Sequence, residues 1–272
     1  MYVLFDIGGT KTRITVSDGN SVPEPKIIPT PPDFQQGLQT IKTIADELAN
    51  GQKIDGVAGG IAGPLDSDKT MLVKSPHVGG WINKPLKEEL QKLFGNNVHL
   101  ENDADLGGLG EATKGAGKDH NIVAYYTVST GVGGVRIVDG KIDQNTLGFE
   151  PGHQIIIPDG NQCECGGKGH LEAYVGGLYL PRTYQQKGEE ITDPKIWDEI
   201  SKNLAIGLTN STVHWSPDIF VLGGSVSKSL PLDRVEFYLK QDLTIFPKTP
   251  ALAKGILGDS AGLYGALVLL VK

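Results

Sequence analysis

The chain has 272 residues, with 25 lysines and arginines against 32 aspartates and glutamates, so its formal net charge is −7. This length fits two domains of ordinary size or one large domain, and the acidic balance argues against non-specific nucleic-acid binding. The content of 39% hydrophobic and 21% charged residues is ordinary for a globular chain and argues against extended disorder.

The apolar stretches are too short for a membrane span. The stretch near the C-terminus, Leu267 to Val271, falls far short of the ~20 residues that cross a bilayer. The apolar run after Met1 has no cationic residue before it and is interrupted by Asp6, which argues against a secretory signal. We therefore expect a cytoplasmic protein without a membrane segment.

Two stretches of the chain share one layout. Tyr2–Ile7 and Arg13–Val16 are predicted strands on either side of a glycine turn. Asn121–Val128 and Val135–Val138 repeat this pattern around a second glycine turn. The separation far exceeds the repeat length of a solenoid, so we predict two related domains that each open with the same hairpin.

Strands and helices alternate along the rest of the chain, which predicts layered α/β domains. In chain order the expected elements are an irregular connection at Pro23–Pro32, a helix at Gln36–Asn50, a strand at Ile54–Ile61, a helix at Pro85–Phe94, a strand at Asn97–Leu100, a helix from Asp103, helices at Leu171–Tyr184 and Ile196–His214, a strand at Asp218–Leu222 and a final helix at Ala261–Val271.

The glycine turns are candidate phosphate sites. Glycine lets backbone N–H groups surround phosphate oxygens, and an aspartate at the strand end, here Asp6, can hold Mg²⁺ through water. Two such turns could close on one polyphosphate. A tight hairpin that needs glycine only for its dihedral angles is an equal alternative for the first turn taken alone. The chain contains neither G-x-x-x-x-G-K-[ST] nor G-x-G-x-x-G, the motifs of P-loop and Rossmann nucleotide-binding folds, which argues against both folds.

Acidic residues follow the predicted strand at Asn97–Leu100. Asp103 stands where a carboxylate would project from the carboxyl edge of a sheet and accept a proton from a substrate hydroxyl, and Asn102 would orient that hydroxyl. The alternative is that Asp103 or Asp105 only caps the next helix, which is the commoner role of such residues.

Four potential metal ligands lie within 18 residues. They are His153, Cys163, Cys165 and His170, and two thiolates with two imidazoles satisfy a tetrahedral zinc ion without leaving an open position for catalysis. Two buried cysteines beside unrelated histidines are the alternative. Glu150 and Glu172 flank the group and could present carboxylates to ligand hydroxyls, and the Gly223–Gly224 turn could admit a nucleoside, although a plain turn fits it equally well.

Taken together, the motifs resemble those of the ROK family, over residues 2 to about 266. They are Asp6-Ile-Gly-Gly-Thr-Lys11, Gly60-Ile-Ala-Gly-Pro64, Glu101-Asn-Asp-Ala104, Ser129-Thr-Gly-Val-Gly-Gly134, Glu150-Pro-Gly-His153, Cys163-Glu-Cys-Gly-Gly-Lys-Gly169 and Leu222-Gly-Gly224. The resemblance implies an actin/hexokinase-like (ribonuclease H-like) fold of two α/β domains, with ATP and Mg²⁺ in the cleft between them, and transfer of the γ-phosphoryl group to a hexose hydroxyl. We expect domains at 1–112 with 257–272 and at 113–256.

The resemblance also implies roles for individual residues. Asp103 corresponds to the general base and Asp6 to the residue that supports magnesium. The sugar-contacting positions are Gly63, His77, Asn102, Asp103, Glu150, His153 and Glu172. The nucleotide-contacting positions are Asp6, Gly8, Gly9, Thr10, Lys11, Thr130, Gly131, Gly133, Gly223 and Gly224.

Two residues depart from the family pattern. His170 replaces a cysteine that ligates zinc in the family, and we expect zinc to be kept with two cysteine and two histidine ligands. His77 replaces an asparagine that contacts sugar hydroxyls, which leaves the identity of the sugar open. Family regulators carry a DNA-binding helix-turn-helix before the first hairpin, and since the hairpin here begins at residue 2, we expect none in this chain.

The sequence thus predicts an ATP-dependent kinase that phosphorylates glucose at the 6-hydroxyl, with structural zinc and a possible homodimer. The alternatives are a kinase for N-acetylmannosamine or N-acetylglucosamine, a fructokinase, and a non-catalytic sugar sensor. A zinc hydrolase is disfavoured because four protein ligands leave no position for an activated water.

Overall fold

The computed structural model describes residues 1–75 and 78–271, which form two compact units. The first unit comprises Met1–Thr113, Gln144–Gly148 and Asp259–Lys272, and the second comprises Lys114–Asp143 and Phe149–Gly258. The sequence-based boundaries assigned Gln144–Gly148 to the second domain, whereas these residues group with the first unit. Each unit is built on one five-stranded mixed sheet.

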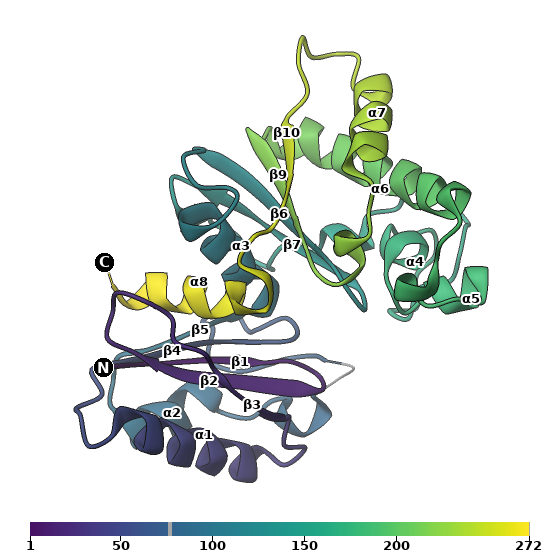
Figure 1. The fold of residues 1–272 in the computed structure, drawn as a ribbon. Coiled ribbons are helices and arrows are strands. Elements are labelled where there is room, and N and C mark those ends of the chain that lie inside the picture. Colours follow the sequence, from purple (N-terminus) through teal and green to yellow (C-terminus); the bar gives the residue numbers. More distant parts are fainter. Residues whose placement is uncertain (76–77, 272) are drawn as a thin grey trace. The chain divides into compact units, whose positions relative to one another are not determined.

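The sheet of the first unit has the strand order β3-β2-β1-β4-β5 (Figure 1). Its strands are β1 (Tyr2–Ile7), β2 (Lys11–Ser17), β3 (Lys26–Pro29), β4 (Gly56–Ile61) and β5 (Val98–Asn102). Strands β1, β4 and β5 are parallel, while β2 pairs antiparallel with both β1 and β3. The carboxyl ends of β1, β4 and β5 therefore meet at one edge of the sheet, where open α/β folds place their ligands.

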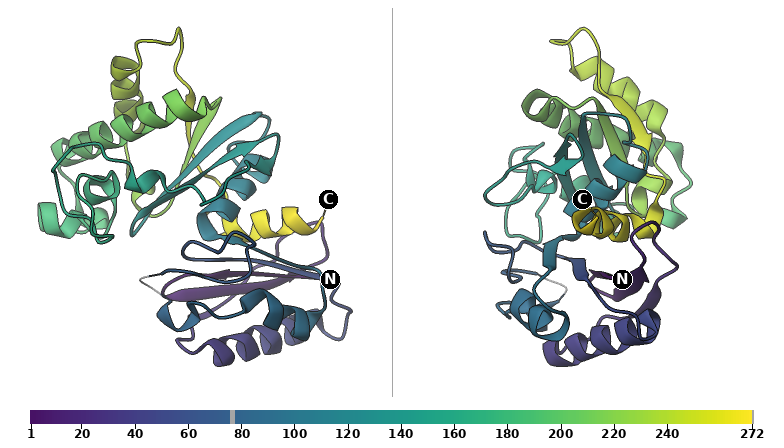
Figure 2. Two further views of the ribbon diagram at one scale, coloured as in Figure 1. Left: turned by 180° about the vertical axis from the view of Figure 1, so that it is seen from behind. Right: turned by 90° about the vertical axis from the view of Figure 1, so that its left-hand side faces the viewer.

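Helices cover both faces of this sheet (Figures 1 and 2). The first face carries α1 (Phe34–Ala49) and α2 (Leu86–Phe94), and the second carries α3 (Asp103–Lys114) and α8 (Ala261–Leu270). Helix α1 begins where the Asp33 carboxylate accepts a 2.8 Å hydrogen bond from the Gln36 N–H. Helices α3 and α8 approach so closely that a Cβ at Gly110 or Gly265 would overlap the other helix's backbone, which explains the small residues of both helices.

The second unit repeats this plan with the strand order β10-β9-β6-β7-β8. Its strands are β6 (Ile122–Val128), β7 (Val132–Val138), β8 (Lys141–Ile142), β9 (Ile219–Gly223) and β10 (Ala251–Lys254). Strand β6 forms a hairpin with β7 and pairs in parallel with β9, as β1 does with β2 and β4. The predicted duplication of a hairpin-led α/β domain is confirmed.

The helices of the second unit pack mainly on one core. Helix α6 (Pro194–Trp215) and helix α7 (Leu232–Asp242) bury apolar side chains against Tyr126 and Phe220 of the sheet. Two short helices, α4 (Glu172–Val175) and α5 (Leu180–Tyr184), precede them. Helix α7 and strand β10 were not predicted from the sequence.

Two sequence-based expectations were wrong. Pro23–Pro32 is not wholly irregular, because Lys26–Pro29 form the edge strand β3, where a proline is tolerated. The expected helix at Leu171–Tyr184 is interrupted between α4 and α5. There the Gly177 N–H donates to Ser129 O at 2.7 Å and the Leu178 N–H to Thr130 O at 2.9 Å, so these groups bond to the β6–β7 turn instead of continuing the helix.

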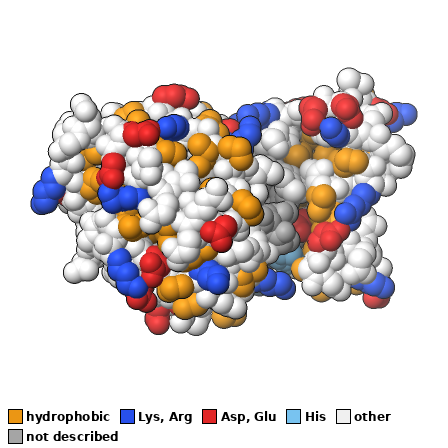
Figure 3. All heavy atoms as spheres, turned by 90° about the horizontal axis from the view of Figure 1, so that it is seen from below, with side chains coloured by type: hydrophobic (Ala, Val, Ile, Leu, Met, Phe, Trp, Pro, Cys, Tyr) orange, Lys and Arg blue, Asp and Glu red, His pale blue; other side chains and the backbone are white. Residues whose placement is uncertain are grey.

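Within residues 1–75 and 78–271, no helix combines the length and apolar character that crossing a bilayer requires. Acidic and basic side chains intermingle on the face of the molecule drawn in Figure 3, so the charge of that face is mixed in sign.

Candidate functional site

The carboxyl edge of the first sheet gathers the candidate catalytic residues. Asn102 ends β5, and its Nδ2 donates to Gly63 O, after β4, at 3.0 Å. Asn102 Oδ1 accepts from the Ala104 N–H at 2.8 Å and so caps α3. Asp103, the first residue of that helix, accepts from the same N–H through Oδ1 at 3.0 Å. Asp103 thus shares the capping role with Asn102 and lies, half-buried, at the expected strand-to-helix junction.

Asp6, at the end of β1, belongs to a group of charges in this unit. Burial, reinforced by the negative charge of Asp103, raises the pKa of Asp6 to about 7. Arg13 opposes that rise, since its Nη1 lies 3.4 Å from Asp6 Oδ2, while its Nη2 bonds Asp259 Oδ2 at 2.8 Å. Sequence analysis missed Arg13 and Asp259. The signal for Arg13 was available, because the hairpin register places Arg13 directly opposite Asp6.

The first glycine turn is held by one hydrogen bond across it and by another from Thr30, which follows β3. The Gly8 N–H donates to Lys11 O at 3.0 Å, and Thr30 Oγ1 donates to Gly8 O at 2.6 Å. Neither Gly8 nor Gly9 has a positive φ, so unusual dihedral angles do not account for these glycines. Gly9, Thr10 and Lys11 are exposed, so this turn can present its backbone to a ligand.

The second glycine turn follows β6. The Ser129 N–H donates to Gly131 O at 2.9 Å, and neither Gly131 nor Gly133 has a positive φ. A Cβ at Gly131 would overlap Oε2 of Glu172, so a larger residue there would force the Glu172 carboxylate to move. Thr130 at the tip is exposed.

The turn after β9 has a different reason for its glycine. Gly224 has a φ of +90°, and a Cβ there would lie 2.6 Å or less from the Val128 carbonyl group. Backbone geometry therefore explains Gly224 without a ligand. Gly223 ends β9 beside the Tyr125 side chain.

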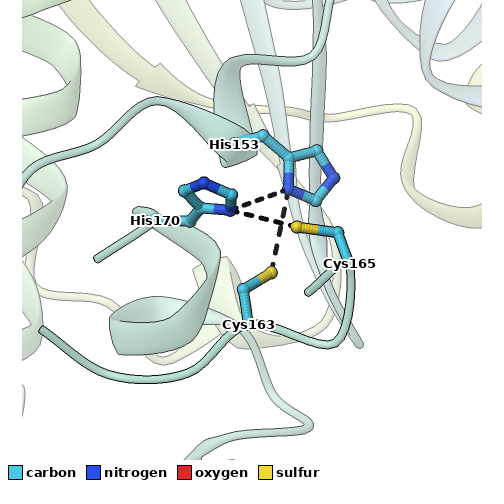
Figure 4. A group of neighbouring side chains, drawn as sticks. All are labelled: His153, Cys163, Cys165 and His170. Carbon is cyan, nitrogen blue, oxygen red and sulfur yellow. Dashed lines mark hydrogen bonds between the residues drawn. The ribbon is translucent and has the colours of Figure 1, made fainter. Parts of the chain in front are cut away.

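The four predicted metal ligands converge in the second unit, with their donor atoms within 4.8 Å of one another (Figure 4). The Nδ1 atoms of His153 and His170 are 3.4 Å apart. Cys163 Sγ lies 3.8 Å from His153 Nδ1, and Cys165 Sγ lies 3.3 Å from His170 Nδ1. For tetrahedral zinc with bonds of about 2.0–2.3 Å, ligand atoms should be roughly 3.3–3.8 Å apart. The donor set and these three distances fit zinc.

The surroundings of the group also fit a cation. The second ring nitrogen of His153, Nε2, lies 3.8 Å from Glu150 Oε2, which is longer than a hydrogen bond but places a carboxylate near the ring, as is common for a metal-bound histidine. Burial raises the pKa of the Cys163 thiol, so a divalent cation would be needed to favour the thiolate there.

The remaining expected site residues fall into two groups. Glu172 begins α4 and is half-buried beside Cys163, whereas Glu150 is exposed. His77 lies outside the described residues. The first unit thus gathers Asp6, Gly8, Gly9, Thr10, Lys11, Gly63, Asn102 and Asp103, and the second holds Thr130, Gly131, Gly133, Glu150, His153, Glu172, Gly223 and Gly224.

Known proteins are similar to this chain in architecture and in sequence. The glucokinase of Streptomyces coelicolor is 30% identical over 96% of this chain and 94% of its own length. The N-acetyl-D-glucosamine kinase of Vibrio atlanticus is 30% identical over 100% of both chains. The solved structure of a ROK family glucokinase from Streptomyces griseus, in complex with glucose and AMPPNP, has a TM-score of 0.82 and 27% identity and covers 98% of each chain.

These similarities and the two hairpin-led units define the fold as the two-domain α/β fold of the actin/hexokinase-like type. The ROK family model matches residues 2–272, and the chain belongs to the ROK family. The fold class and the family expected from the motifs are confirmed. The relatives described above are sugar kinases, and they differ in the sugar that their names give.

Proposed function

We propose that this protein is an ATP-dependent sugar kinase that phosphorylates glucose at its 6-hydroxyl. The observation that carries the proposal is the placement of Asp103 and Asn102 at the carboxyl edge of the first sheet, beside Asp6. The glucokinase of Streptomyces coelicolor and the glucose and AMPPNP complex of the Streptomyces griseus enzyme support glucose and ATP as the substrates.

In the proposed reaction Asp103 accepts the proton of the sugar hydroxyl as its oxygen attacks the γ-phosphorus, and the bond from that phosphorus to the ADP oxygen breaks. Asn102, fixed by Gly63 and α3, orients the hydroxyl. Asp6 would hold Mg²⁺ through water, and Mg²⁺, when bound, neutralises charge on the phosphates.

The other proposed contacts rest on the resemblance of these motifs to those of the ROK family. Backbone groups of both glycine turns would bind the phosphates. The turn after β9 would bind the adenosine. Sugar hydroxyls would meet Gly63, His77, Asn102, Glu150, His153 and Glu172. His153, Cys163, Cys165 and His170 would hold a structural zinc ion that stiffens the loop carrying Glu150 and Glu172.

The test is sugar-dependent ADP release from ATP and Mg²⁺, with glucose, mannose, fructose, N-acetylglucosamine and N-acetylmannosamine as acceptors. We expect the highest kcat/KM with glucose. A preference for N-acetylglucosamine, which the Vibrio atlanticus relative makes the second candidate, would replace glucose in the proposal. Sugar binding without ADP release from any acceptor would overturn the kinase and favour a sensor.

The pKa of Asp6 predicts a pH dependence. Only the carboxylate form of Asp6 can bind a hydrated cation. The kcat/KM for ATP should therefore fall about tenfold per pH unit as the pH drops below about 7. Arg13 lowers that pKa, so Arg13→Gln should move this acid limb to higher pH. The pH profile of kcat/KM is the measurement, and Lys26→Gln, which removes an exposed pair with Glu47, is the control. An unmoved limb in Arg13→Gln would contradict the assignment.

A further inference from the structure

The carboxylate of Glu172 has a partner at each oxygen. Oε2 accepts a 3.0 Å hydrogen bond from the Val132 N–H, at the start of β7. Oε1 accepts from the Tyr179 hydroxyl at 3.4 Å and lies 3.5 Å from Cys163 Sγ. One side chain therefore joins the second glycine turn to the Cys/His group.

The chain after Glu172 holds the same turn from the same side. The N–H groups of Gly177 and Leu178 donate to the carbonyl oxygens of Ser129 and Thr130. With Glu172 bonded to Val132, three hydrogen bonds from residues 172–178 reach a turn of four residues, 129–132. Glu172 supplies the charged one of the three, and hydrogen bonds to a charged group are the stronger kind.

The other end of this connection is buried. Cys163, Ala173 and Tyr179 pack as one apolar cluster, and the Tyr179 hydroxyl lies 3.5 Å from Cys163 Sγ. The Glu164 N–H donates to that hydroxyl at 3.0 Å, which fixes its position. The Glu172 carboxylate is thus held in place from the Cys/His side and offers a fixed acceptor to the turn.

We propose that Glu172 is a positioning residue that fixes the Ser129–Val132 turn in the form that receives nucleotide phosphates, and that it ties this turn to the Cys/His group. This inference rests on the proposed function for the role of the turn. A positioning role and a sugar contact make different predictions. Only the positioning role predicts that loss of the Glu172 carboxylate weakens nucleotide binding in the absence of sugar.

The first test is the affinity of a non-hydrolysable ATP analogue, measured by calorimetry without sugar. Glu172→Ala should raise its Kd about tenfold or more, the range for losing a hydrogen bond to a charged group. Glu172→Gln, which keeps an oxygen acceptor for the Val132 N–H, should restore part of the loss. The matched control is Glu236→Gln, which breaks an exposed pair with Lys240 on α7 and should leave the Kd unchanged. An unchanged Kd in Glu172→Ala overturns the inference.

A second variant isolates the contact itself. A Cβ at Gly131 would overlap Glu172 Oε2, so Gly131→Ala should weaken analogue binding in the wild-type background and much less in Glu172→Ala, where that overlap is gone. Equal fold-changes in the two backgrounds would show that the contact does not carry the effect, and would overturn the inference.

A third readout does not need nucleotide at all. The Val132 amide should exchange its hydrogen faster in Glu172→Ala than in the wild type, while amides of the first unit keep their rates. If the wild type binds no ATP analogue, the proposed function fails. If the Val132 amide still exchanges faster in Glu172→Ala, Glu172 remains the residue that holds the turn. Unchanged exchange at Val132 would overturn the positioning role itself.

Discussion

Asp103→Asn is expected to lower kcat for sugar phosphorylation by about 10²- to 10⁴-fold, the usual contribution of a general base. An amide cannot accept the hydroxyl proton, yet its oxygen can still accept from the Ala104 N–H, as Asp103 Oδ1 does at 3.0 Å. The start of α3 should therefore remain intact. Steady-state kinetics with the preferred sugar, together with thermal unfolding, give the measurement.

A control variant distinguishes the two possible roles of Asp103, general base and helix cap. Asp33 caps α1 in the same unit through Gln36, and Asp33→Ala should cost about 1 kcal/mol of stability without changing kcat. If Asp103 serves only to cap α3, Asp103→Ala should behave like Asp33→Ala, with reduced stability and normal turnover. That result would contradict the assignment of Asp103 as the base.

The features that the sequence predicted well are those carried by local patterns. The hairpin of β1 and β2, the junction of β5 with α3 at Asp103, and the grouping of Cys163 with His170 all depend on residues close together in the chain. Short motifs at strand ends also predicted that Asp6 and Asp103 would each follow a strand, and the parallel pairing seen in the structure brings these two strand ends to one sheet edge.

The features that the sequence did not predict depend on distant partners. Asp259 reaches Arg13 across 246 residues, and no local pattern indicates that pair. The break between α4 and α5 was missed because the N–H groups of Gly177 and Leu178 bond to a turn nearly fifty residues earlier, which overrides the helical spacing of apolar side chains. Sequence analysis predicted Glu172 only as a contact for ligand hydroxyls, and its hydrogen bond with Val132 became visible only in the structure.

His170→Ala is expected to remove the metal and to destabilise the second unit. Three ligands would remain, and we expect zinc affinity to fall at least about 100-fold, or about 2.8 kcal/mol at 1.4 kcal/mol per tenfold. Since the folded chain alone offers the assembled site, this loss appears as reduced stability, and Tm should fall by about 5–10 °C. Metal analysis of protein purified without chelator should give about one zinc per wild-type chain and much less in the variant.

His170→Cys is the matched variant, because it supplies a thiolate where the imidazole stands. Cys165 Sγ and His153 Nδ1 both lie within 3.4 Å of His170 Nδ1, so a sulfur at that position remains within reach of the same ion. We expect His170→Cys to keep one zinc and a Tm near that of the wild type. If the wild type holds no zinc and a chelator leaves its Tm unchanged, the metal assignment fails, and the two histidines and two cysteines form only a packed polar cluster. If both His170 variants keep full zinc, His170 is not a ligand and the ion is held by the other three side chains with water or another group in the fourth position.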